Sequence, residues 1–267
     1  MIIPFVFALM LHHEEATVDH IAKTAFGFNS VFARREIIPS ENKNTFVIVP
    51  FAEYSFLELK AFTASIRADV PFGFVLERFY FSDLAGTVRA TFGIGRSFSI
   101  TPLISTEFPT GGDLATSDHV SLFPALAFEM HVGAFTHIHL HGVIGYKLAL
   151  GGNHHSETEG DHSDHSDHSH AAPSLSTHKA NYLFPHSEKE IMSHIGVMFG
   201  ILEVLAVDIR PNFFLEDMNK FVFQPMLGLV LSIPTDYFSV RSNLYGFWAL
   251  GGVRKGYGVG LLSYILF

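Results

Sequence analysis

Apolar and polar side chains alternate along almost the whole chain, and this alternation constrains the fold more than any other feature of the sequence. In FTASIRADVPF, residues 62–72, every second side chain from Phe62 to Phe72 is apolar, and mainly hydroxyl-bearing and charged residues lie between them. The segments 97–108, 207–213 and 237–248 repeat the pattern. Because successive side chains of a β-strand point to opposite faces, the pattern predicts many strands, each with one apolar and one polar face.

The apolar faces are too rich in large side chains for the core of one soluble domain. The chain has 28 Phe, and 16% of its residues are charged, against about a quarter in typical soluble proteins. Its longest apolar run, MIIPFVFALML, is about half of the ~20 residues that a membrane-spanning helix needs. These features favour strands that present their apolar faces to lipid and their polar faces to a lumen. The predicted fold is therefore all-β: a transmembrane antiparallel up-and-down β-barrel in the bacterial outer membrane, in contact with its lipid.

The alternating segments divide into about twelve strands, an even number as in bacterial barrels. The connections between them alternate in length. LELK, GIGR, VGAF, VLAV and PTDY are tight, whereas GFVLERFYFSD, PTGGDLATSD and a His-rich stretch are long. Since periplasmic turns are short and extracellular loops are longer, this alternation predicts a periplasmic C-terminus. The predicted strands are 24–38, 44–57, 59–74, 81–95, 97–109, 118–132, 135–150, 189–204, 206–216, 220–233, 236–249 and 253–267.

Residues 1–23 precede the predicted barrel, which occupies residues 24–267. They begin with the apolar stretch of a signal peptide but have neither its basic start nor an A-x-A cleavage site. We interpret the segment as either a signal remnant or a periplasmic N-terminal segment. It also carries His12, His13, Glu14, Glu15 and His20, which fit a solvated tail with some affinity for metal.

Two motifs resemble known outer-membrane proteins. Residues 67–150 contain RADVPFGF, GTVRATFGIG and TPLISTEFPTGGDLATSDHVSLFPALAFE. A strand ending in a Phe-Pro-Thr-Gly loop and followed by another strand resembles the putative transporters of the meta-pathway of phenol degradation, which implies a twelve-stranded transporter. The end of the chain, GVGLLSYILF, resembles the last strand of outer-membrane barrels. That resemblance implies recognition by the barrel-assembly machinery through the strand ending in Phe267.

The predicted extracellular loop at about 151–188 is rich in His and Asp, with the repeat DHSDHSDHS at its centre. Imidazole and carboxylate groups bind Zn, Cu and Ni. Histidines spaced three residues apart in a flexible loop fix no coordination geometry, so they suit metal capture rather than one rigid site. The same composition also fits a solvated surface loop with incidental metal affinity. The candidate metal ligands are His154, His155, Asp161, His162, Asp164, His165, Asp167, His168 and His170.

A second group of histidines lies on predicted strands. His137, His139 and His141 share the polar face of one strand, and the preceding strand carries Glu129 and His131 on its polar face. A tight VGAF turn predicts His131 opposite His137 and Glu129 opposite His139, with Cβ atoms ~4.5–5.5 Å apart. The group is therefore a candidate lumenal metal site, or else a set of polar side chains that fill the lumen; His194 is predicted to face the same lumen.

The predicted function is an outer-membrane transporter or channel for small solutes, with a His-rich loop that binds divalent metals and feeds a His-lined lumen. No obligatory cofactor is expected. The net charge of −9 argues against nucleic acid as a partner, and without a nucleophile beside a positioned His we expect no enzyme. The residues predicted to line the lumen are Arg67, Asp69, Arg89, Glu107, Lys147, Asp208, Arg210 and Arg241.

Two alternatives remain. The barrel could transport small aromatic or hydrophobic compounds, as the family resemblance implies and as Phe123, Tyr237, Tyr245 and Phe247 would suit. It could instead be a surface barrel that binds metal and transports nothing.

Overall fold

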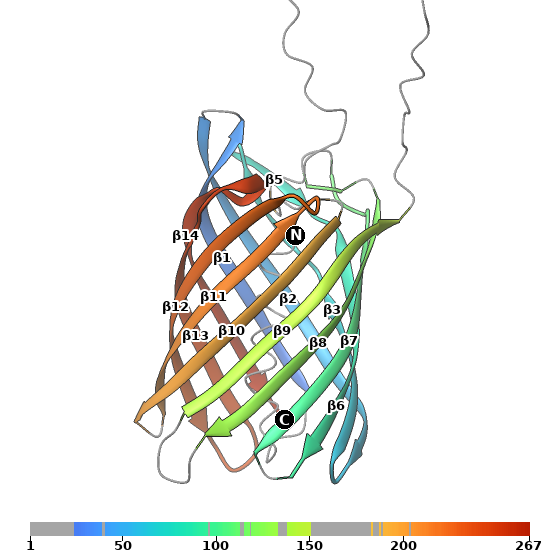
Figure 1. The fold of residues 1–267 in the computed structure, drawn as a ribbon, viewed down its shortest axis with the longest axis vertical. Coiled ribbons are helices and arrows are strands. Elements are labelled where there is room, and N and C mark those ends of the chain that lie inside the picture. The colour runs from blue at the N-terminus through green and yellow to red at the C-terminus, as the bar shows by residue number, and fades with distance from the viewer. Residues whose placement is uncertain are drawn as a thin grey trace, which may run out of the picture.

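The computed structural model describes residues 24–38, 41–95, 97–112, 115–117, 119–132, 138–150, 183, 187, 189–202 and 204–267. Fourteen described strands form one antiparallel sheet, and β1 pairs with both β14 and β2, so the sheet closes on itself. The short strands β4 and β5 are a hairpin added beside β2. The remaining strands form a closed twelve-stranded barrel, which confirms the predicted fold (Figure 1).

The strands of the barrel are long and tilted (Figure 1). Their bounds are β1 Ala25–Ile38, β2 Glu41–Leu59, β3 Phe62–Asp69, β6 Leu84–Ile94, β7 Phe98–Phe108, β8 Val120–Val132, β9 Ile138–Leu150, β10 Lys189–Leu202, β11 Leu205–Glu216, β12 Lys220–Pro234, β13 Ser239–Ala249 and β14 Gly256–Leu266. Each corresponds to one of the predicted strands, and the connections at the barrel end that holds the C-terminus are all short, whereas the long ones lie at the other end (Figure 1).

The third predicted strand, 59–74, is present but is interrupted at Val70 and Pro71. Strand β3 ends at Asp69, and after Pro71 the chain forms β4, Phe72–Val75, which pairs with β2. The Val70 N–H donates to the Pro50 carbonyl at 3.0 Å, so β4 continues along β2 in the register of β3, while its other edge pairs with β5 instead of β6. The predicted loop that follows contains a strand, β5, Arg78–Phe81. Leu76 and Glu77 join the two short strands with φ of 50° and 63°, the left-handed conformation that a two-residue type I′ turn requires.

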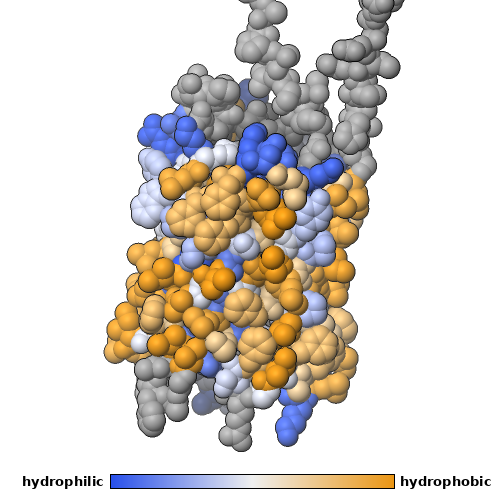
Figure 2. Space-filling view, viewed as in Figure 1, coloured by the Kyte–Doolittle hydropathy of each residue, from blue (hydrophilic) through white to orange (hydrophobic). Residues whose placement is uncertain are grey.

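The two faces of each strand differ as the alternation predicts. In β13, Leu244 and Trp248 are each 57% exposed on the outside, whereas the alternate residues Asn243, Tyr245 and Phe247 are buried inside. The outer surface carries a broad band of apolar side chains (Figure 2). Such a band is unfavourable in water but is the surface that lipid solvates. Among the described residues, no helix is long and apolar enough to cross a membrane.

One outward position of the last strand is polar, and the pairing of β13 with β14 explains it. Val259, Leu261 and Ile265 of β14 point outward, and Ser263 takes the same face between them. Ser263 lies directly opposite Ser242 of β13, and their hydroxyl oxygens are 2.9 Å apart. The two hydroxyls therefore satisfy each other on the apolar surface.

Candidate transport lumen

The interior of the barrel is lined by oppositely charged pairs. In β3, Arg67 Nε donates to Asp69 Oδ1 at 3.0 Å, and both side chains are buried. Across β3, Arg89 of β6 forms an ion pair with Glu53 of β2. The sequence analysis did not single out Glu53, although Glu53 lies in phase with the inward-facing Val49 and Phe51. Pairing of this kind is what allows so many charges to be buried.

A third pair likewise joins two strands that are separated by another. Lys147 of β9 donates to Glu107 of β7 at 2.9 Å, across the inner face of β8.

Of the residues predicted to line the lumen, Arg241 is half-buried and its guanidinium lies 3.7 Å from the sulfur of Met198. The others are all buried on inward-facing positions: Arg67, Asp69, Arg89, Glu107, Lys147, Asp208 and Arg210.

One histidine has a partner on the neighbouring strand and another on the strand beyond it. His141 of β9 contacts His194 of β10 through Nδ1 at 3.2 Å and Asp208 of β11 through Nε2 at 3.0 Å. Asp208 is also paired with Arg210 on its own strand. The ring lies over Gly196, where an added Cβ would come within 2.4 Å of it. Only a residue without a side chain allows this close approach at that position.

A second group lies beside it on β8 and β9. Glu129, His131 and His139 each offer one ligand atom, and these atoms all lie within 4.8 Å of one another. The rings of His131 and His139 have centroids 3.8 Å apart. His139 Nδ1 lies 3.7 Å from Glu129 Oε1. Glu129 is buried, whereas the two imidazoles are half-buried.

The register of this hairpin differs from the predicted one by two residues. His131 lies opposite His139, and Glu129 lies opposite His141; the prediction had placed His137 opposite His131 and His139 opposite Glu129. Five residues separate the last paired positions of the two strands, more than a tight hairpin needs. A shift of two residues leaves every side chain on its predicted face. His137 lies outside the described residues.

The barrel end opposite the C-terminus carries a buried cluster that sequence reasoning missed. Arg254 lies in the 3-10 turn Gly252–Arg254 between β13 and β14, and its side chain is fully buried. It donates to Glu190 at 2.6 Å, forms an ion pair with Glu216, and lies over the ring of Phe214. The alternation showed the two carboxylates on polar faces, but a short turn gives no signal that its arginine points inward.

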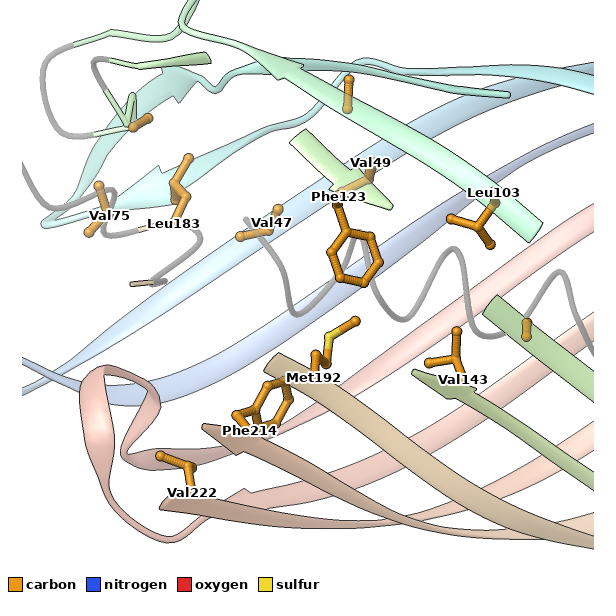
Figure 3. Close-up of a cluster of buried hydrophobic side chains, with 13 residues drawn as sticks. Val47, Val49, Val75, Leu103, Phe123, Val143, Leu183, Met192, Phe214 and Val222 are labelled. Atoms are coloured by element: carbon orange, nitrogen blue, oxygen red, sulfur yellow. The ribbon is translucent and has the colours of Figure 1, made fainter. Parts of the chain in front are cut away.

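Part of the inner wall is apolar. Phe123, Met192 and Phe214 extend from β8, β10 and β11 into the same region (Figure 3). Phe123 packs against Gly145, where a Cβ would lie 2.4 Å from the ring. The buried apolar residues of this inner cluster are Val47, Val49, Val75, Ala85, Leu103, Ala115, Phe123, Ala127, Val143, Leu183, Met192, Phe214 and Val222. Polar and apolar surfaces therefore both line the interior.

Three aromatic residues predicted for the interior are inside and one is not. Phe123, Tyr245 and Phe247 are buried. Tyr237 lies in the connection between β12 and β13 and is 88% exposed, so its prediction as a lumenal residue is wrong. It falls just before β13 begins, where the alternation no longer fixes a face. The ligands predicted in the loop, His154 to His170, and the segment 1–23 lie outside the described residues.

The fold is similar to that of solved outer-membrane barrels. The COG4313 outer membrane channel from Pseudomonas putida F1 aligns over 92% of this chain and 96% of its own, with a TM-score of 0.61 and 10% identity. The translocator domain of the autotransporter NalP from Neisseria meningitidis aligns over 98% and 96%, with a TM-score of 0.53 and 8% identity. The NanC porin aligns over 91% and 99%, with a TM-score of 0.52 and 8% identity.

No family model matches the chain, and no curated protein matches it. At these identities the likeness is one of fold. The fold is that of outer-membrane β-barrels, in agreement with the predicted location in a bacterial outer membrane.

Proposed function

We propose that this protein is an outer-membrane channel for small solutes. The observation that carries the proposal is the closed barrel whose inward positions hold paired charges while its outward positions are apolar. A wall of fixed charges of both signs suits the passage of ions and small polar solutes. The likeness in fold to a solved outer-membrane channel supports the proposal.

Conductance across a planar bilayer tests this function. The refolded full-length protein is expected to give discrete current steps in chelator-treated buffer. A twelve-stranded barrel has a narrow interior, so the steps should be small and should exclude large solutes. A correctly folded barrel without any conductance would argue instead for a surface protein that transports nothing.

The proposal also assigns a role in metal capture to the His-rich segment 151–188. Its composition supports the capture of Zn, Cu or Ni outside the membrane. Flux of these ions into liposomes is compared between the full protein and a variant that lacks residues 153–178. Lower metal flux with unchanged K⁺ conductance supports capture by the segment, whereas equal metal flux in the two proteins contradicts it.

A second candidate cargo is a small aromatic or apolar compound. The inner apolar cluster favours it (Figure 3), as does the resemblance to the putative transporters of the meta-pathway of phenol degradation. Phe123→Gln should then lower the flux of an aromatic solute relative to a polar solute of equal size. Ser99→Asn, a polar exchange at an inward position of β7, is the control and should leave the ratio unchanged.

We also propose the barrel-assembly machinery as a partner through the end of β14. Phe267 lies against Phe26, with ring centroids 6.2 Å apart, and its N–H donates to the carbonyl of Thr24 at 2.9 Å. Deleting Phe267 should reduce the amount of folded barrel in cells but leave refolding into detergent largely unchanged. Equal amounts in cells would contradict this role.

A further inference from the structure

We propose that Glu129, His131 and His139 form a binding site for a divalent transition-metal ion inside the barrel. Among the residues that the structure describes, this is the group whose imidazole and carboxylate atoms lie close enough together to hold one ion. The proposal goes beyond the channel function and does not depend on conduction, since it needs only the folded β8–β9 hairpin.

The strand pairing fixes the arrangement. His131 and His139 are directly opposite each other on the inner face of β8 and β9, and Glu129 lies two residues from His131 on that face. Directly opposite Cβ atoms lie ~4.5–5.5 Å apart, which the hydrogen-bonded backbone holds constant. The three ligands therefore come from a rigid wall of the barrel rather than from a loop.

The donor set indicates the class of ion. Two imidazole nitrogens and one carboxylate oxygen suit Zn, Cu or Ni, whereas Mg and Ca prefer oxygen ligands alone. Ligand atoms around tetrahedral zinc lie about 3.3 Å apart, given Zn–ligand bonds of about 2.0–2.1 Å. The three ligand atoms lie within 4.8 Å of one another, and rotation of the side chains would bring them to that distance. Three protein ligands leave a fourth position for water from the lumen.

Glu129 provides an independent indication. Its side chain is 2% exposed, and neither carboxylate oxygen accepts a hydrogen bond in the described part of the structure. A buried carboxylate is costly unless a charge or a set of donors compensates it. The charge of Arg241 acts on Glu129 without a hydrogen bond, and a bound cation would compensate the carboxylate directly. His139, which is 15% exposed, leaves the group open to ions from the lumen.

His141 and His194 lie next to the proposed site but contact other side chains, so a substitution there serves as a control for metal binding. Both ring nitrogens of His141 already contact other side chains, His194 and Asp208. His141 would have to give up these contacts to bind a metal. The site is therefore limited to Glu129, His131 and His139, although the sequence analysis grouped His141 with them.

Zinc binding to the refolded full-length chain tests the site. The background protein carries Asn in place of the histidines at 12, 13, 20, 154, 155, 162, 165, 168, 170, 178 and 186, so that these do not bind zinc. Equilibrium dialysis should give one zinc ion per barrel. Glu129→Gln and His139→Asn should each weaken binding at least tenfold, and His194→Asn should change it less than twofold.

Absorption of bound Co²⁺ gives a second measurement, since Co²⁺ in a site of this kind has a visible spectrum that Glu129→Gln should alter. Circular dichroism establishes that each variant is a folded barrel. A folded background protein that binds no zinc would overturn the proposal. So would equal affinity in the parent, Glu129→Gln and His139→Asn. Because conductance is measured without metal, a failure of the channel function is distinguishable from a failure of this site.

Discussion

His141 on β9 reaches across β10 to Asp208 on β11, with 3.0 Å between the imidazole Nε2 and the carboxylate Oδ1. The contact joins two strands that are not hydrogen-bonded to each other. It exists because Gly196, on the strand between them, leaves room for the ring. The inner wall is thus tied together by side chains as well as by the backbone ladder.

Replacing Gly196 by Ala should therefore destabilise the barrel. The new Cβ would lie within 2.4 Å of the His141 ring, which must move away from Asp208. Overpacking of this kind typically costs about 1–3 kcal/mol. Urea unfolding in detergent measures the change. Gly86→Ala is the control, because its Cβ would meet a single atom at 3.9 Å; an equal loss in both variants would contradict the explanation.

Removing Arg254 should destabilise the barrel more strongly than most substitutions. Glu190 and Glu216 would remain buried without their shared cation, and breaking a buried pair typically costs about 3–5 kcal/mol. Arg254→Met is compared by urea unfolding with the triple variant that also carries Glu190→Gln and Glu216→Gln. The triple variant should recover most of the loss. Lys255→Ala, at the exposed neighbouring residue, should change stability by no more than about 0.5 kcal/mol.

The pair of Lys147 and Glu107 should influence ion selectivity in opposite directions. Lys147→Gln removes a positive charge from the interior and should shift the reversal potential toward cation selectivity, whereas Glu107→Gln should shift it toward anions. The double variant should return close to the parent, since the two groups are 2.9 Å apart and neutralise each other. Bilayer recordings in a KCl gradient measure these shifts. Identical reversal potentials in all four proteins would show that ions do not pass this pair.

A charge placed on the apolar band should be costly. Ile144, near the middle of β9, is 57% exposed, and Arg at the midplane of a lipid-facing strand costs about 2–4 kcal/mol. Tyr237→Arg is the comparison, because Tyr237 lies in a connection beyond the strands and should lose about 0–1 kcal/mol. Unfolding from lipid vesicles measures both. A similar cost at the two positions would contradict the assignment of the band to lipid.

The alternation of the sequence was enough to predict the barrel, because the direction of a side chain in a strand depends only on its own position along the strand. Arg67, Lys147 and Asp208 therefore appear inside, and Leu244 outside, as the pattern indicates. The period of two also placed Glu129, His131 and His139 on one face, since the error in the hairpin register was an even number of residues.

The tertiary structure alone decided which of these side chains meet. Register is set by turn length and by pairing between distant segments. The sequence therefore could not show that His141 contacts Asp208 whereas His139 lies beside Glu129. It could not show that beyond Pro71 the third strand keeps its pairing with β2 but exchanges β6 for β5 on its other edge. It also gave no sign that Arg254 turns inward to two strand ends far away in the chain. The local pattern determined whether each side chain points into or out of the barrel, whereas the pairing of the strands in the closed barrel determined which side chains contact one another.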